Sequence, residues 1–413
     1  MAAIGNATIF LVLLLSTWAG GLAIVGGRRG SRRLVGAAEF LVHAVAAITS
    51  LAMLVLIYGL VVSDYSMSYV HSHSERAMPL FYRVTSVWAG MEGSMLTWVW
   101  ALALVSSLAV WHNRSRLRVM MPQVIAILMS VVLFFGVLMV LHSNPFLAYL
   151  GEAPLTGKGL NPLLQNPYMV THPPALYLGF VGLTIPFAFA FGALLSKQTD
   201  DAWIRAARPW AVWAWYFLSL GLALGMLWAY EELGWGGYWG WDPVENAALM
   251  PWLVATAFLH SIIIQERRRM FRGWSVVLAL LAFVLTIVGT FMTRSGFVDS
   301  VHAFGRSSIG YVFLAYIAFL LVAGFGLVIA RRKLLAPEHG IESLLSRESA
   351  VLLVNWVLLA AALLVLGLTI FPNISETFGQ KINISIPIFK RWMSPVGLVI
   401  LALTAIGPML GYR

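Results

Sequence analysis

The sequence contains no cysteine, and only 11% of its 413 residues are charged. Without cysteine the chain offers neither a disulfide nor a thiolate metal site, so any thiol chemistry must come from a partner. The low charge, together with 60% hydrophobic residues in long apolar runs, excludes a soluble domain. Fixed-period repeats and low-complexity segments are also absent from the sequence. The composition predicts a polytopic membrane protein with a single membrane domain, residues 1–413.

Eleven apolar segments are each near the length of about 20 residues that a helix needs to cross a bilayer. The longest loops between them, residues 63–93, 142–173 and 372–393, all fall on one side of the membrane. The fold expected is therefore all-α, a bundle of about eleven transmembrane helices. The predicted spans are 7–25, 38–62, 94–111, 121–141, 174–195, 209–230, 245–264, 274–292, 309–330, 350–371 and 394–411.

The distribution of positive charge predicts the orientation of the chain. Arg28, Arg29, Arg32 and Arg33 follow the first apolar run instead of preceding it, which argues against a cleaved signal peptide and for an N-terminus outside. Most of the other Lys and Arg residues fall in alternate loops on the same, presumed inner side. The net charge of +10 is therefore interpreted as an orientation signal. We expect no nucleic acid partner.

The segment 235–246 has three tryptophans and one tyrosine among glycines, directly before an apolar helix. Asp242 fits an N-cap, Pro243 the first helical position and Glu245 the third, which together predict a capping box. The glycines leave the ring faces uncovered, so the segment is expected to form a flat aromatic platform that stacks a large planar ligand. An aromatic belt at the lipid headgroups is the alternative. A belt gives no reason for four aromatic residues interleaved with three glycines.

Two histidines are expected on the same membrane face as this platform. His172 precedes two prolines, which we expect to hold it extended and then to begin the fifth span. His302 lies in the outer loop between the eighth and ninth spans, and counting the spans places both histidines on the same membrane face as the aromatic segment. Such a pair can supply both axial ligands to a haem iron. Taken alone, each histidine is more typical of a loop residue at the headgroups, and it is the face shared with the aromatic segment that favours the ligand interpretation.

A third histidine is expected within the membrane. His260 lies 17 residues after Pro243, roughly 26 Å along a helix, in the inner half of the bilayer. An ionisable group at that depth is a functional candidate, although a hydrogen bond within the bundle is the plain alternative. His43 follows Glu39 by four residues and is interpreted as its structural partner. The others lack a metal ligand set and are interpreted as loop or headgroup residues: His71, His73, His112, His142 and His339.

With these motifs, the chain resembles the CcmF type of haem-handling membrane proteins of cytochrome c maturation. The aromatic segment is similar to the tryptophan-rich signature of that family, and the similarity runs nearly end to end. Further stretches that carry it are Asn6 and residues 90–94, 143–146, 160–165, 172–174, 258–261, 294–296, 301–304 and 346–349.

The resemblance implies a haem lyase, which joins haem vinyl groups to the thiols of a Cys-x-x-Cys-His segment of apocytochrome c outside the membrane. His172 and His302 match the outer haem ligands of the family, and His260 matches the first ligand of a haem b within the membrane. The second intramembrane ligand has no counterpart here, because it belongs to further spans that such proteins have beyond residue 413. We therefore expect a chain that lacks these C-terminal spans, with a second chain as a possible source of them.

The expected outer haem-binding region is formed by residues 142–174, 231–246 and 293–308. Asp242 would direct the platform, and Arg294 would pair with a haem propionate, because guanidinium groups bind carboxylates with two hydrogen bonds. The porphyrin would contact four aromatic residues: Trp235, Tyr238, Trp239 and Trp241.

The resemblance also implies partners and a location. The partners are a CcmE-type haem chaperone, a CcmH-type subunit that presents the apocytochrome, and apocytochrome c itself. The location is the bacterial cytoplasmic (inner) membrane, with the active face in the periplasm. An alternative function is a haem transporter or carrier without bond formation, for which inverted repeats and helices broken at mid-depth are expected and are not found in the sequence. A purely structural subunit would not require outward-facing histidines around an aromatic platform.

Overall fold

The computed structural model describes residues 1–234, 236–300 and 308–412. Over these residues the regular secondary structure is helical, apart from one isolated bridge between Met67 and Ala148. Short 3-10 turns lie at Ser86–Trp88, Pro162–Leu164, Arg332–Leu335 and Gly407–Met409. The α-helices are α1 (Ala2–Arg29), α2 (Arg32–Val62), α3 (Ser68–His73), α4 (Leu80–Thr85), α5 (Met91–Asn113), α6 (Met121–Leu141), α7 (Pro167–Gly182), α8 (Thr184–Ser196), α9 (Ala202–Glu232), α10 (Pro243–Arg268), α11 (Arg272–Ser295), α12 (Ile309–Ala330), α13 (Arg347–Thr377) and α14 (Ile386–Ile406).

Eleven helical segments in the described part of the chain are long and apolar enough to cross a membrane, which confirms the all-α fold and the number of spans. Nine are single helices, the fifth is the pair α7–α8, which is interrupted at Leu183, and the eleventh joins α14 to the 3-10 turn Gly407–Met409. Several helices extend beyond the predicted apolar segments, as α9 does at both ends. Helical hydrogen bonding continues into the polar interface, whereas hydropathy marks only the hydrocarbon part of a span.

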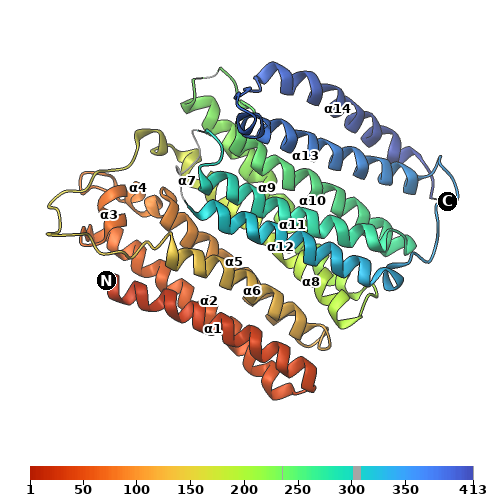
Figure 1. Ribbon diagram of the computed structural model, residues 1–413, viewed down its shortest axis with the longest axis horizontal. Helices are drawn as coiled ribbons and strands as arrows, with labels where there is room; N and C mark the ends of the chain where they lie inside the picture. Colours follow the sequence, from red (N-terminus) through yellow and green to blue (C-terminus); the bar gives the residue numbers. More distant parts are fainter. Residues whose placement is uncertain (235, 301–307, 413) are drawn as a thin grey trace.

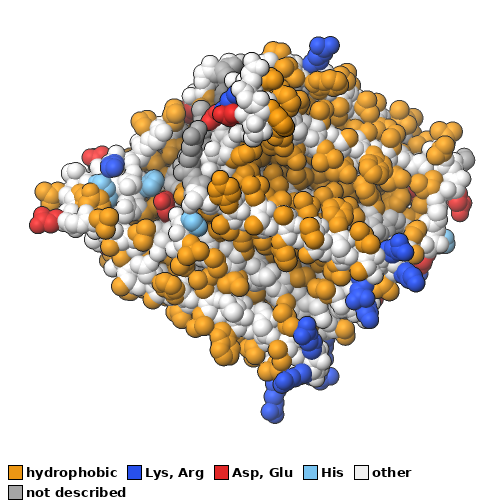
Figure 2. Space-filling view, viewed as in Figure 1, with side chains coloured by type: hydrophobic (Ala, Val, Ile, Leu, Met, Phe, Trp, Pro, Cys, Tyr) orange, Lys and Arg blue, Asp and Glu red, His pale blue; other side chains and the backbone are white. Residues whose placement is uncertain are grey.

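The helices run side by side in one bundle (Figure 1). The pair α7–α8 occupies the centre of the bundle, and 89% of its most apolar 18-residue stretch is buried. It packs against α5, α6, α9 and α11. Helices α1 and α2 form one margin of the bundle, and α14 forms the other. None of the most apolar 18-residue stretch of the α14 span is buried. The two termini lie at opposite ends, as an odd number of crossings requires. Figure 2 shows a broad hydrophobic surface with Lys and Arg gathered along one end.

The start of α7 differs from the sequence prediction. His172 was expected in an extended segment before the fifth span, but the helix begins at Pro167 and continues through the two prolines that follow His172. Asn166 caps this helix, because its side chain accepts a hydrogen bond from the Tyr168 amide at 2.8 Å. Pro167 occupies the first helical position, where a missing N–H costs nothing. His172 is therefore held in the second turn of a rigid element.

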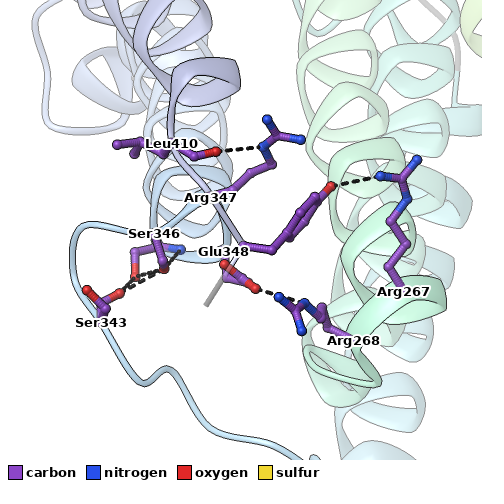
Figure 3. Close-up of polar contacts among 9 residues, drawn as sticks. Arg267, Arg268, Ser343, Ser346, Arg347, Glu348 and Leu410 are labelled. Atoms are coloured by element: carbon purple, nitrogen blue, oxygen red, sulfur yellow. Dashed lines mark hydrogen bonds and ion pairs between the residues drawn. The ribbon is translucent and has the colours of Figure 1, made fainter.

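Polar contacts join α10, α13 and the C-terminal segment at the end of the bundle where the chain ends (Figure 3). Arg268 Nε lies 3.1 Å from the Glu348 carboxylate, which is 1% exposed. Arg347 Nε donates to the Leu410 carbonyl at 3.2 Å, and Ser346 caps the start of α13. Since breaking a buried ion pair leaves an uncompensated charge, these residues hold the three elements together. The stretch 346–349 therefore has a structural role, and it lies at the opposite end of the bundle from the aromatic segment.

Candidate functional site

Hydrogen bonds from a buried asparagine fix the beginning of α7 to the end of α9. Asn166 is 5% exposed, and its Nδ2 donates to the Glu231 carboxylate at 2.8 Å and to the Glu232 carboxylate at 2.9 Å. Hydrogen bonds to charged acceptors are stronger than neutral ones. The first turns of α7 are therefore held in a defined position relative to α9.

The imidazole of His172 lies against α9. Its Nδ1 is 2.7 Å from the Gly221 carbonyl oxygen, and because a carbonyl only accepts, Nδ1 must carry the proton. In the neutral ring the lone pair is then on Nε2, the atom that would bind a metal. Histidines that bind metals usually have this second hydrogen bond, which fixes the tautomer and the ring orientation. Gly225 makes room for the ring, since a Cβ there would lie 2.5 Å from His172 Cε1.

His172 lines a cavity of about 250 Å³ between α5, α7, α9, α10 and α11. Its walls include the aromatic residues Trp98, Tyr177 and Trp228, and Arg294 also lines it. Pockets for drug-sized ligands typically measure about 300–1,000 Å³, so this cavity accommodates only part of a large planar molecule. The cavity combines aromatic side chains with one buried cation, so it suits the apolar edge of a ligand that carries a carboxylate.

Arg294, the predicted partner of a haem propionate, is in the last turn of α11 and is only 1% exposed. Its Cζ is 5.6 Å from the Trp98 ring centroid and 5.9 Å from that of Tyr177, and its Nη2 donates to Ser94 Oγ at 3.1 Å. The aromatic rings and the hydroxyl hold the guanidinium in place from two sides. A cation buried in this way favours an anionic group in the adjoining cavity.

The predicted capping box at the start of α10 is confirmed. Asp242 accepts from the Val244 amide at 2.9 Å, while the Glu245 carboxylate accepts from the amides of Asp242 at 3.1 Å and Gly240 at 3.0 Å. Asp242 also accepts a hydrogen bond from Ser300 Oγ at 2.7 Å. This contact brings the loop after α11 against the aromatic segment, so the two lie at the same end of the bundle.

Among the described residues of the aromatic segment, the two tryptophan rings do not lie in one plane as a flat platform would require. The rings of Trp239 and Trp241 are perpendicular, with an interplanar angle of 88° and centroids 5.9 Å apart. Trp241 also stacks on Phe389 of α14, with centroids 5.2 Å apart and an angle of 11°. The backbone of Trp241 is left-handed, with φ of 55°. Tyr238 is 64% exposed and remains available to a ligand.

The structure brings together part of the predicted outer site. His172 and Arg294 line one cavity with the first turn of α10, which begins directly after the aromatic segment. Trp235 and His302 lie outside the described residues. The loop that leads to His302 is nevertheless placed beside the aromatic segment up to residue 300 by the hydrogen bond to Asp242.

Sequence reasoning did not identify the aromatic lining of the cavity. Trp98, Tyr177 and Trp228 come from three different helices, and no motif marks them as neighbours. Phe389 was missed as well, because it reaches Trp241 from the other end of the sequence. The repeated aromatic residues of α9 were a weak signal, since in a membrane protein they are equally typical of lipid contact.

Three of the stretches that carried the family resemblance, Asn6, 90–94 and 143–146, make structural contacts. Asn6 Nδ2 donates to the Phe146 carbonyl at 3.0 Å, and Asn144 Nδ2 donates to Asn6 Oδ1 at 2.6 Å. The Gly90 amide donates to the Tyr69 hydroxyl at 3.1 Å. These bonds attach the outer loops to the ends of α1 and α5. They position the rim of the bundle and supply no group to the cavity.

His260 lies about two thirds of the way along α10, partly buried. In the described part of the chain no hydrogen bond of ordinary geometry reaches its Nδ1, which is buried. His43 was expected to pair with Glu39, but its Nδ1 is 2.7 Å from Ser107 Oγ of α5. Helix α2 packs with α1, α5 and α6, whereas α10 packs with α9, α11 and α13 (Figure 1). His43 is thus on the other side of the bundle and cannot complete a site at His260.

The architecture defines an integral membrane protein in which one histidine, hydrogen-bonded through Nδ1 to a backbone carbonyl, lines a cavity beside a tryptophan-rich segment. Residues 88–298 match the family described as cytochrome C assembly protein. They run from Trp88, the first residue in the chain that lines the cavity, to the loop after α11. The chain belongs to this family.

Relatives that match nearly the whole of this chain support the assignment. The chain is 38% identical to the cytochrome c-type biogenesis proteins CcmF of Pseudomonas aeruginosa and Escherichia coli, over 99% of this chain and 63% of each relative. A solved structure of the cytochrome c haem lyase CcmF aligns with a TM-score of 0.82 and 34% identity, over 100% of this chain and 62% of that one. These matches confirm the resemblance to the CcmF type. The chain spans less than two thirds of the length of these relatives.

Proposed function

We propose that this chain acts in haem attachment to c-type cytochromes, holding haem at the outer membrane face as the haem-binding part of a haem lyase. The observation that carries the proposal is the single cavity that His172 and Arg294 share next to the tryptophan-rich segment. A fixed imidazole and a buried guanidinium match the iron and a propionate of haem, which lie on one molecule. The relatives named CcmF and the haem lyase structure support the same function.

Each predicted site residue has a role in this proposal. His172 binds the iron through Nε2, and His302 binds it from the opposite face. Arg294 binds one propionate within the cavity, and Asp242 fixes the start of α10 and the loop after α11 around the ligand. The rest of the porphyrin projects from the cavity and contacts the aromatic segment: Trp235, Tyr238, Trp239 and Trp241.

The reaction proposed is addition of a thiol across a haem vinyl group. The sulfur forms a C–S bond to one vinyl carbon, and the thiol hydrogen passes to the other, so the step needs no external oxidant. The chain contains no cysteine, and both thiols belong to the Cys-x-x-Cys-His segment of the apocytochrome. Holding the vinyl edge against a presented thiol makes the encounter effectively unimolecular, which is the main catalytic contribution of such a site.

Within the membrane, we propose His260 as one axial ligand of a haem b. Its partly buried imidazole on α10 fits such a role, and the group would supply electrons that keep the substrate iron reduced. The described residues offer no second histidine beside it, so the other ligand comes from elsewhere. We expect the purified chain to hold this haem poorly or five-coordinate, and to gain a low-spin spectrum when co-expressed with a polypeptide that carries further spans. A stoichiometric bis-histidine spectrum of the chain alone would contradict this.

The partners and location follow from the same proposal. A CcmE-type chaperone delivers haem, a CcmH-type subunit presents the apocytochrome, and the chain lies in the bacterial cytoplasmic membrane with its N-terminus and haem site in the periplasm. Reporters fused after Arg269 and after Lys333 should then be cytoplasmic, and reporters near Trp239 and His302 periplasmic. Finding Trp239 and His302 on opposite faces would end the model of a haem held between them.

The central test replaces His172 or His302 with glycine. Each variant should retain less haem when loaded through the chaperone, and added imidazole should restore part of it by refilling the vacant coordination position. His339→Gly, an exposed histidine at the other end of the bundle, is the matched control. Haem content unchanged in both ligand variants would remove them as ligands. Covalent haem on a Cys-x-x-Cys-His substrate, stable to acid extraction, distinguishes a lyase from a carrier, which would release haem unattached.

A further inference from the structure

A second, independent site lies at the opposite end of the bundle, where the turn between α1 and α2 meets the connection between α5 and α6. There the structure has an open cleft of about 800 Å³. Arg32 from the first turn and Arg114 and Arg118 from the second line it, together with Glu39 and a floor of small residues. We name it the arginine cleft. It contains none of the residues assigned to haem.

The arginine cleft carries excess positive charge. Three arginines and one glutamate line the cleft, and in the described part of the chain no ion pair joins Arg32, Arg114 or Arg118 to an acidic residue. Every ion pair found at this end of the bundle involves other arginines. Positive charge held in a concave site concentrates anions more effectively than the same charge spread over a surface.

The N-terminus of α2 reinforces this charge. Helix α2 begins with Ser31 as its cap and Arg32 as its first residue, and both residues line the cleft. The first turn of α2 contains no acidic residue. The partial positive charge at this helix start is therefore not offset by a carboxylate of the same turn.

The cleft is open at its glycines. A Cβ placed on Gly30 or Gly36 would meet nothing within 4 Å, so the space at these two lining residues is open. Exposed apolar side chains lie close in sequence to the lining residues: Phe40, next to Glu39, is 69% exposed, Val119, next to Arg118, is 64% exposed, and Trp111, three residues before Arg114, is 60% exposed. Polar and charged groups thus lie at the membrane end of a surface suited to hydrocarbon chains. Figure 2 shows this combination, with basic side chains at the corner where α1 turns into α2 and hydrophobic atoms above them.

We propose that the arginine cleft binds the phosphate of an anionic phospholipid, with the acyl chains lying along the exposed apolar side chains of α2 and α5. The phosphate diester meets the guanidinium groups and the N-terminus of α2, which are the kinds of donor that phosphate prefers in proteins. The chemistry shared with free phosphate is the anionic phosphoryl group. The adjoining apolar surface favours a lipid as its source, and basic pockets between transmembrane helices are a common form of lipid site.

The test is native mass spectrometry of the whole chain in detergent, titrated with dioleoylphosphatidylglycerol or dioleoylphosphatidylcholine. The wild type should bind one phosphatidylglycerol in preference to phosphatidylcholine. The affinity of the variant R32Q/R114Q/R118Q for phosphatidylglycerol should be lower by about 20-fold or more, because each basic residue near a head group contributes roughly fivefold. The variant R28Q/R29Q/R33Q removes the same charge from the same end but none of the groups that line the cleft, and it should change the affinity by less than about threefold.

A second variant tests the space instead of the charge. Gly36→Leu keeps every charge and fills the open floor, and it should weaken phosphatidylglycerol binding by about 10-fold. Equal losses in the two arginine triples, or no loss in the cleft triple and in Gly36→Leu, would overturn the proposal. Displacement of phosphatidylglycerol by inorganic phosphate, with no preference over phosphatidylcholine, would assign the cleft to free phosphate and also overturn it.

Discussion

Replacing Gly225 with alanine should disturb the outer haem site without touching any ligand. Gly225 is on α9 directly opposite the imidazole of His172, where a new Cβ would lie 2.5 Å from Cε1 and 2.8 Å from Nδ1. Ordinary contacts of this kind measure 3.4–4 Å, so the ring must shift by roughly 1 Å. Such a shift breaks the 2.7 Å hydrogen bond between His172 and the Gly221 carbonyl.

The size of the effect follows from the role of that hydrogen bond. It fixes the tautomer that leaves the lone pair on Nε2, and loss of such a support typically costs about 10–100-fold in metal affinity. We expect a loss of about 10-fold in affinity for haem, equivalent to about 1.4 kcal/mol. Global stability should change much less, because alanine is the better helix former by roughly 0.5–1 kcal/mol and offsets part of the clash. Affinity and stability therefore separate in this variant.

The assay is a titration of the purified protein with haem, followed in the absorption spectrum, beside thermal unfolding of the same samples. Gly326→Ala on α12 and Gly367→Ala on α13 are matched controls, since a Cβ at either position meets nothing within 4 Å. Both should bind haem as the wild type does. If Gly225→Ala binds haem equally well, the hydrogen bond to Gly221 does not position His172 for iron and the argument for this ligand fails.

Three further predictions concern Arg294, Asp242 and His73. Arg294→Gln should lower haem affinity by about 10-fold and leave the affinity for haem dimethyl ester unchanged, because the ester has no carboxylate for the guanidinium; equal losses for both ligands would exclude propionate binding. Asp242→Ala removes a helix cap and the acceptor for Ser300, and should lower the free energy of unfolding by roughly 1–2 kcal/mol, seen as a lower Tm in detergent. Burial lowers the pKa of His73 below its usual 6.5, so below pH 6.5 the unfolded chain takes up a proton that the folded chain does not, and stability should decrease as the pH falls. His73→Gln should remove that part of the pH dependence and His339→Gln should not; a decrease unaffected by His73→Gln would contradict this assignment.

The sequence alone determined the number of spans and the local structure around Asp242. Hydropathy over about 20 residues reports transfer of a helix into hydrocarbon, which does not depend on which neighbours that helix has. The capping box depends on residues three positions apart, and its hydrogen bonds are those expected from the sequence. The sequence also indicated the shared end of His172 and the aromatic segment, because alternation of spans is a topological consequence of crossing a membrane.

Only the tertiary structure decided how those groups face one another. Trp241 stacks on Phe389, a contact across 148 positions that no local pattern reports. Arg294 is buried beside Trp98 of α5 and Tyr177 of α7, two neighbours that the sequence did not indicate. Ring orientation, burial and the tautomer of an imidazole are all set by contacts between helices that are remote in sequence, and these contacts exist only once the bundle has formed.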